Sequence, residues 1–260
     1  MTVDQNRLLW GNDYSWPQDG GEWSEWWGTP RSQWFGCLLP RIFPFLGGST
    51  LEIATGRGRW TQFLLASSTS LIGIDIVSSC VEFCKQRFKD LPHVTFCLND
   101  GRTLPGVANA SIDFVFSFDS LVHSDADTME SYTRELQRVL KPNTGVAFIH
   151  HSNLAGATRS IYKKVRDRLS DNRFDTRKRS PSMSAKIMRG LAGNCGMSCV
   201  HQELVPWGCE SALLLDCMST IVNRPNAAGQ ITINRRFMNE AASIKLISSM
   251  GTTMEPPSFQ

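Results

Sequence analysis

Two groups of residues in this chain are suited to chemistry: a glycine turn that could hold a ligand, and histidines that could move a proton. Gly56 and Gly58 stand one residue apart, directly after the apolar run 51–54. Glycines leave room for a ligand beside the backbone, and the free amides of a following helix can face that ligand. Asp75 ends the next apolar run, 71–75, where a carboxylate can accept hydrogen bonds from both hydroxyls of a ribose. The pattern therefore predicts a strand, helix, strand unit that binds a nucleotide-type cofactor.

Charge and a missing glycine indicate which cofactor this is. A dinucleotide site usually continues to a third glycine, but Gly58 is followed by Arg59, Trp60, Thr61 and Gln62. Glu52, at the end of the first apolar run, would repel a pyrophosphate. It suits a cofactor with positive charge, such as the sulfonium and ammonium groups of S-adenosylmethionine (SAM).

Ordinary structural roles compete with this interpretation. The two glycines also fit a plain turn from strand to helix. Asp75 could cap the next helix, a role for which Ser78 and Ser79 compete. The acidic residues that accompany the glycines favour cofactor binding.

The strands and helices that must position these groups alternate along the chain. A proline turn after 136–141 closes a helix. We expect later strands at 94–98, 146–149, 198–205 and 212–222, a strand followed by its loop within 111–123, and helices at 182–194 and 231–249. Such alternation is typical of a single α/β domain.

These motifs, in this order, resemble class I SAM-dependent methyltransferases of the type 11 kind, whose first motif reads E-x-x-x-G-x-G. The resemblance implies an α/β, Rossmann-like sheet of seven strands flanked by helices, ending in an antiparallel hairpin. It also places a turn that touches adenine at 99–101, although Asn-Asp-Gly is a common turn sequence in its own right. The predicted cofactor-binding residues are Glu52, Ala54, Gly56, Gly58, Trp60, Asp75, Ile76, Asn99, Asp100, Gly101, Phe118, Asp119 and Ser120.

Three of the five histidines lie where the fourth and fifth strands are expected to end: His123, His150 and His151. Methyl transfer to a hydroxyl needs a base, and imidazole can take a proton near neutral pH. Strand alternation sends His150 and His151 to opposite faces, so only one of them is expected to reach the cleft. We favour His151 as the base, with His150 second and His123 as base or acceptor-binding group. A structural imidazole is the alternative for each.

A narrower resemblance concerns the segments 10–16, 118–123 and 149–153. They are similar to methyltransferases found with polysaccharide and glycan biosynthesis enzymes, including a sugar O-methyltransferase of mycobacterial methylmannose polysaccharides. This implies an O-methyltransferase with a small-molecule or oligosaccharide acceptor. The alternatives are an O- or N-methyltransferase of secondary metabolism and a SAM-binding protein without catalysis.

The regions outside the cofactor core differ in composition. We divide the chain into an N-terminal cap (1–49), a SAM-binding core (50–225) with a basic insertion (154–181), and a C-terminal helix and tail (226–260). The cap holds six of the eight tryptophans, which either pack it onto the core or stack on an acceptor such as a sugar. The basic insertion is either a lid that attracts an anionic substrate or a solvated helix.

Composition limits the other functional classes. With 260 residues, 41% hydrophobic residues and a net charge of +3, the chain can bury one sizeable core. The sequence contains no run of about 18 apolar residues, so we expect a cytoplasmic enzyme with no membrane partner. Nucleic acid is disfavoured because the basic run has few aromatic residues. A divalent metal such as Mg²⁺, held by Asp119 with Asp125 or Asp127, and a homodimer are left open.

Overall fold

One mixed sheet organises the computed structural model, which describes residues 1–157, 179–207 and 213–251. Its strands are β1 (Ser49–Ile53), β2 (Ser70–Asp75), β3 (Val94–Leu98), β4 (Phe114–Ser117), β5 (Val146–Ser152), β6 (Ser198–Val205), β7 (Asp216–Val222) and β8 (Gln230–Ile233). The α-helices are α1 (Val3–Leu8), α2 (Pro30–Gln33), α3 (Leu39–Ile42), α4 (Thr61–Leu64), α5 (Ser78–Arg87), α6 (Ala126–Val139), α7 (Leu154–Ala157), α9 (Ala185–Asn194) and α10 (Phe237–Gly251). Short helical turns are η1 (Leu9–Asp13), η2 (Gly21–Trp27), η3 (Trp34–Leu38), η4 (Phe43–Phe45), η5 (Leu65–Ser67) and η6 (Leu121–His123).

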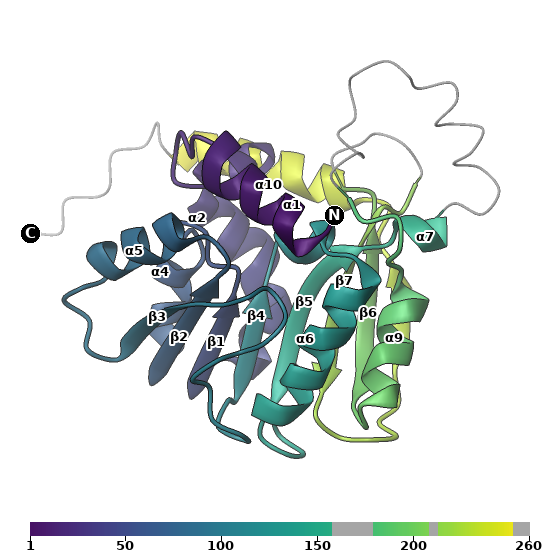
Figure 1. Ribbon diagram of the computed structural model, residues 1–260. Helices are drawn as coiled ribbons and strands as arrows, with labels where there is room; N and C mark the ends of the chain where they lie inside the picture. Colours follow the sequence, from purple (N-terminus) through teal and green to yellow (C-terminus); the bar gives the residue numbers. More distant parts are fainter. Residues whose placement is uncertain (158–178, 208–212, 252–260) are drawn as a thin grey trace, which may run out of the picture.

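The strand order β3-β2-β1-β4-β5-β7-β6-β8 confirms the predicted α/β, Rossmann-like architecture (Figure 1). The first five strands in this order pair in parallel, and β7 pairs antiparallel with both β5 and β6. From β1 the chain adds β2 and β3 on one side, and from β4 it adds β5 on the other side. The direction in which strands are added therefore reverses between β1 and β4. In open α/β sheets a ligand crevice lies at that reversal, beyond the carboxyl ends of the strands.

The sheet has eight strands where seven were expected, because the segment predicted as a helix over 231–249 divides in two. Its start is β8, which pairs in parallel with β6 at the sheet edge. The β-branched run Ile231-Thr232-Ile233 favours a strand over a helix. The remainder forms α10.

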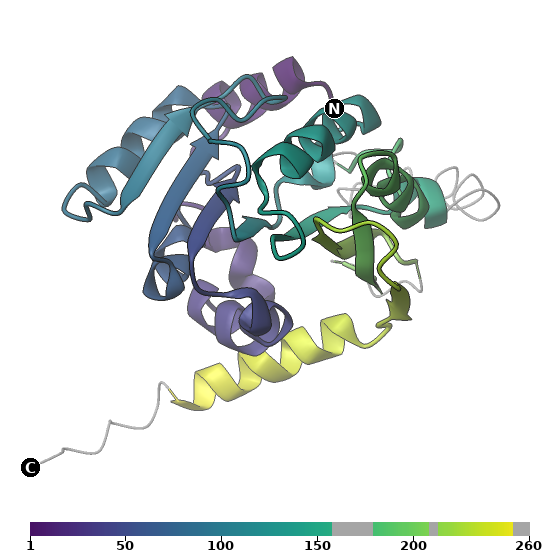
Figure 2. The same ribbon diagram turned by 90° about the horizontal axis from the view of Figure 1, so that it is seen from below.

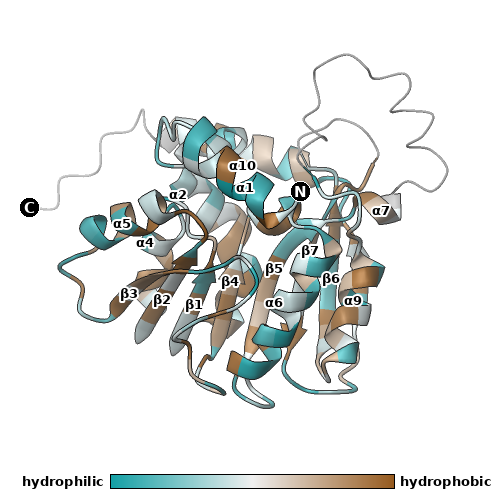
Figure 3. Cartoon of the chain, viewed as in Figure 1, coloured by the Kyte–Doolittle hydropathy of each residue, from teal (hydrophilic) through white to brown (hydrophobic). Residues whose placement is uncertain are grey.

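Apolar side chains cover both faces of the sheet, as buried parallel strands require. On one face, Val115 and Ile149 pack with residues of α6 and α9. On the other face, Phe116 and Phe148 pack with Trp34 and other residues that precede β1. Figure 2 shows these two helical layers on opposite sides of the sheet, and Figure 3 shows mostly hydrophobic strands behind a largely hydrophilic α6.

The N-terminal segment lies across the carboxyl edge of the sheet, with α1 above the strand ends (Figure 1). On the outer side, α10 packs on η2, α2 and η3, so the C-terminal helix contacts residues 21–38 of the N-terminal segment. Within the described ranges, the structure contains no helix with the length and apolarity that a membrane crossing needs. Most of the predicted basic lid, residues 158–178, lies outside the described residues.

Candidate functional site

A cavity of about 280 Å³ lies at the carboxyl ends of β1, β2 and β4, beside the reversal of strand order. Of the residues predicted to bind the cofactor, Glu52, Gly58 and Asp100 do not line it. The other ten do: Ala54, Gly56, Trp60, Asp75, Ile76, Asn99, Gly101, Phe118, Asp119 and Ser120. The fold therefore gathers most of the predicted residues around one space.

The turn after β1 depends on its two glycines for different reasons. Gly56 has a φ of +53°, and a Cβ there would lie 2.8 Å from the ring of Trp16, which belongs to the N-terminal segment. Gly58 has a φ of +80°, but its missing Cβ leaves room for Phe88, at the end of α5. Gly56 thus lets the Trp16 ring cover the turn after β1, whereas Gly58 lets Phe88 of the α5 end pack closely against that turn.

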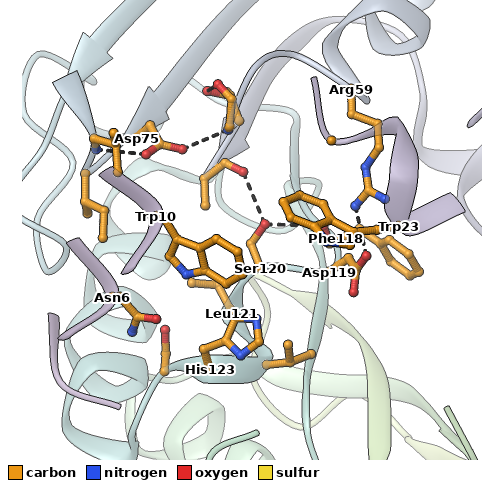
Figure 4. A pocket seen from close by; sticks show the side chains of 18 of the residues that line it. Asn6, Trp10, Trp23, Arg59, Asp75, Phe118, Asp119, Ser120, Leu121 and His123 are labelled. Atoms are coloured by element: carbon orange, nitrogen blue, oxygen red, sulfur yellow. Dashed lines mark hydrogen bonds and ion pairs between the residues drawn. The ribbon is translucent and has the colours of Figure 1, made fainter. Parts of the chain in front are cut away.

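Asp75 presents a carboxylate at the end of β2 in a fixed orientation (Figure 4). Its Oδ2 accepts a hydrogen bond from the Gly56 amide at 2.8 Å, and its Oδ1 accepts one from the Val77 amide at 2.9 Å. Burial raises the pKa of Asp75 to about 6, while the amide hydrogen bonds oppose that shift. The group is therefore mostly ionised at neutral pH, as acceptance of two ribose hydroxyls requires.

Glu52 does not face the cavity, contrary to our expectation. Its side chain is 1% exposed and accepts a hydrogen bond from the Thr61 hydroxyl. Burial raises the pKa of Glu52 to about 8, so the group is mostly neutral at pH 7. Glu52 therefore stabilises the start of α4 beneath the turn and supplies little charge to a cationic ligand.

The turn after β3 separates Asn99 from Asp100. Asp100 is exposed and accepts hydrogen bonds from the amides of Arg102 and Thr103, so it stabilises a turn instead of lining the cavity. Asn99 is buried, and its amide nitrogen donates to the Thr103 carbonyl and the Tyr132 hydroxyl. These bonds fix the orientation of the amide, and its Oδ1 has no hydrogen-bond partner among the residues that the structure describes.

These features fit SAM. The unpaired Asn99 Oδ1 is an acceptor for an amino group such as that of adenine, because a buried acceptor without a donor costs about 1–3 kcal/mol. The Asp75 carboxylate, at the end of the neighbouring strand, suits a ribose diol. Asn99 and Asp75 are therefore the residues that would hold the nucleoside. SAM supplies an electrophilic methyl group when bound.

Arg59 is a cavity residue that the sequence reasoning did not single out. It is 6% exposed, and its Nη2 forms an ion pair with Asp119 Oδ2 at 2.9 Å (Figure 4). Its guanidinium also lies over the rings of Trp60 and Trp23, 4.4 and 5.3 Å from their centroids. Arg59 thus joins the glycine turn, the turn after β4 and the N-terminal segment. Its place directly after the glycines is the signal that could have identified it.

The three candidate histidines have different surroundings. His123, on η6, lines the cavity, and its ring lies 5.3 Å from that of Trp10 (Figure 4). His150 and His151 do not line it. Both are fully buried inside β5, which extends to Ser152 instead of ending near 149.

His151, our preferred base, is held on the opposite side of the sheet from His150. Its Nδ1 lies 2.9 Å from the Ser152 carbonyl oxygen, and its Nε2 lies 2.8 Å from Ser219 Oγ. Burial lowers the pKa of His151 to about 4, so the imidazole is neutral. Because both nitrogens have buried partners away from the cavity, this geometry does not support His151 as the base.

The N-terminal segment closes the cavity with packed aromatic rings and carboxylates. Trp10, Tyr14, Trp16 and Trp23 contact one another, with centroid separations between 5.1 and 6.4 Å. Three acidic residues of the same segment also line the cavity: Asp19, Glu22 and Glu25. The predicted cap therefore provides both apolar surface and hydrogen-bond acceptors.

No cluster of three or more His, Cys, Asp or Glu suited to a metal ion is found among the described residues. Two of the three carboxylates considered for Mg²⁺ have other partners, since Asp119 pairs with Arg59 and Asp125 caps α6 by accepting from the Thr128 amide. The third, Asp127, is exposed and does not line the cavity. The side chains considered for Mg²⁺ therefore do not form a metal site.

Comparisons with known proteins agree with this geometry. Residues 50–143 match a family model described as "Methyltransferase domain". Over 128 residues, or 48% of the chain, the sequence is 31% identical to the biotin biosynthesis bifunctional protein BioHC of Cellvibrio japonicus (strain Ueda107). The chain spans about a quarter of the length of that relative (24%).

Solved structures share the fold. The PH0226 protein of Pyrococcus horikoshii OT3 superposes with a TM-score of 0.56 at 19% identity, covering 83% of this chain and 95% of that one. A SAM-dependent methyltransferase from Methanosarcina mazei gives a TM-score of 0.55 at 18% identity, covering 73% of this chain and 99% of that one. At these identities the likeness shows the architecture alone.

Proposed function

We propose that this chain, whose residues 50–143 match a methyltransferase domain, is a class I SAM-dependent methyltransferase that transfers a methyl group from SAM to a hydroxyl of a small polar acceptor such as a sugar. One observation carries the proposal: ten predicted cofactor residues and His123 line a single cavity at the carboxyl edge of the sheet. A nucleoside site beside a potential base is what methyl transfer to a hydroxyl requires.

His123 is the proposed base. It follows the β4 turn that carries Asp119 and Ser120, and all three residues line the cavity. A neutral imidazole can take the proton of an acceptor hydroxyl as that oxygen attacks the methyl carbon in line. SAM held by Asp75 and Asn99 would supply the methyl group, with S-adenosylhomocysteine as the leaving group.

Aromatic and acidic residues support a small polar acceptor. Trp23 and Trp26 line the cavity, and Trp26 is 49% exposed, so an indole face is available at its margin. Indole faces stack on apolar ring surfaces. Glu22 and Glu25 lie on the same turn and can accept hydrogen bonds from hydroxyl groups.

The acceptor class is tested by measuring methyl transfer from labelled SAM to a panel of glycosides, phenols and amines, with and without a chelator. We expect methylated glycosides, with the label on oxygen. Methylation of amines alone would replace this acceptor class with the nitrogen acceptors considered above. Loss of activity with the chelator would show that methyl transfer needs a metal ion.

The base is tested by comparing His123→Gln with the control His93→Gln, which lies outside the cavity. We expect H123Q to lower turnover about 100-fold or more, because general base catalysis typically contributes that much. The Kd for SAM should stay within about twofold of the wild type, and H93Q should keep full turnover. Full turnover in H123Q would remove His123 from the mechanism.

A further inference from the structure

We propose that His150 is a positioning residue that holds the turn after β4 in shape through the Asp119 backbone, and that it does not act as a base. This inference rests on the proposed function, since that turn carries residues of the cavity. It assigns a role to a buried imidazole which the methyl-transfer scheme itself does not use.

The hydrogen bonds of His150 fix which ring nitrogen carries the proton. The Asp119 amide donates to His150 Nδ1 at 3.1 Å, so Nδ1 must be unprotonated. The hydrogen therefore sits on Nε2, which donates to Asp216 Oδ2 at 3.2 Å. A proton taken up at Nδ1 would break the bond to Asp119. The role of a base is thus incompatible with the role seen here.

Two aromatic rings hold the imidazole plane in place. Phe118 stacks on it at 4.6 Å between centroids, and Trp207 lies 4.8 Å away. Both residues line the cavity, whereas His150 itself is completely buried behind them. The ring can therefore influence the cavity through these neighbours, through Asp119 and, by way of Asp216, through Arg179.

A buried ion pair anchors the other side of His150. Arg179 donates to both oxygens of Asp216, at 2.6 and 2.8 Å, and Arg179 also lines the cavity. Burial alone would raise the pKa of Asp216, but Arg179 and His150 hold it well below its usual range. Asp216 is therefore a permanent acceptor that keeps His150 in one tautomer and one orientation.

The turn held by His150 is conformationally unusual. Asp119 has a φ of +64°, in the left-handed region that residues other than glycine seldom adopt. Its backbone N–H is fixed by His150 and its carboxylate by Arg59. If the His150 bond is lost, Asp119 and the adjacent Ser120 can relax, and the cavity changes shape.

Two substitutions separate the hydrogen bond to the Asp119 amide from the hydrogen bond to Asp216. The side-chain oxygen of His150→Asn falls near the Nδ1 position and can still accept from the Asp119 amide, but it cannot reach Asp216. The amide of His150→Gln reaches the Nε2 position and can still donate to Asp216, but it leaves the Asp119 amide without an acceptor. Both variants remove the imidazole, so a base would be lost equally in each.

The experiment measures hydrogen exchange of the Asp119 amide, the Kd for S-adenosylhomocysteine, and kcat and KM with their pH dependence. We expect H150N to keep amide protection, cofactor affinity and the wild-type pH profile. In H150Q, exchange should be about tenfold faster and kcat/KM about tenfold lower or more. Equal defects in both variants, or a pH-profile limb lost in both, would overturn the proposal.

Failure of the proposed function is distinguishable from failure of this inference. If the wild type methylates no acceptor, the proposed function is wrong, yet the exchange and binding comparisons still test the role of His150. If the melting temperature falls in both variants while Asp119 protection stays as in the wild type, His150 only stabilises the fold and the inference is wrong.

Discussion

Two carboxyl groups on neighbouring strands, Glu52 and Asp75, show how much local surroundings decide a role. Both read as acidic partners of the glycine turn in the sequence. Asp75 lines the cavity and accepts two amide hydrogen bonds, whereas Glu52 is enclosed beneath the turn with a hydroxyl partner. The position of each carboxyl group depends on whether it lies at the end of its strand, at the carboxyl edge of the sheet. The residue type alone does not reveal that position.

The pKa of Glu52 gives a pH-dependent stability prediction. Burial raises this pKa from about 4.5 in the unfolded chain to about 8 in the folded protein. The folded state therefore binds the proton more tightly, and the stability that this provides is lost as pH rises through about 8. Glu52→Gln cannot ionise and should escape that loss.

We expect thermal unfolding to show E52Q gaining stability relative to the wild type between about pH 5 and about pH 9, by at least about 1 kcal/mol. Glu82→Gln, on the exposed side of α5, is the control and should shift little. A stability difference between E52Q and the wild type that does not change with pH would contradict this account of Glu52.

At the scale of elements, local patterns predicted β1, the glycine turn, β2 and the later strands, because strand periodicity and turn residues are read from adjacent positions. β5 continues beyond its predicted end at 149, and the longer strand does not support the preference for His151 as the base. Antiparallel pairing with β7 continues to Ser152 opposite Asp216, which draws His150 and His151 into the sheet. Such pairing depends on a distant segment, so the fifth strand's own sequence could not show it.

The glycine turn gives a prediction with a matched control. Gly56→Ala places a methyl group against Trp16 and forces alanine into a left-handed conformation. We expect calorimetry to show SAM affinity falling about tenfold or more, with a lower melting temperature. Gly190→Ala, at an exposed helical site of α9 with nothing within 4 Å, should keep affinity and gain roughly 0.5–1 kcal/mol. Unchanged SAM binding in G56A would exclude this turn from the site.

At the scale of the whole molecule, the N-terminal segment covers the site, and α10 packs on that segment from the outside. Trp16 covers the glycine turn, while Trp27 packs against Trp207 and against Phe237 of α10. The sequence predicted that the tryptophans pack or bind. The sequence could not show which tryptophan packs and which lines the cavity, since these contacts join residues far apart in the chain.

Calorimetric titration of SAM into the full chain and into Asp75→Asn tests the central claim most directly. The account predicts one site per chain in the wild type and affinity about tenfold weaker or more in D75N, because a hydrogen bond to an ionised group contributes about 1.5–3 kcal/mol. Absence of binding to the wild type, or equal affinity in both proteins, would contradict a cofactor site at the carboxyl ends of β1 and β2.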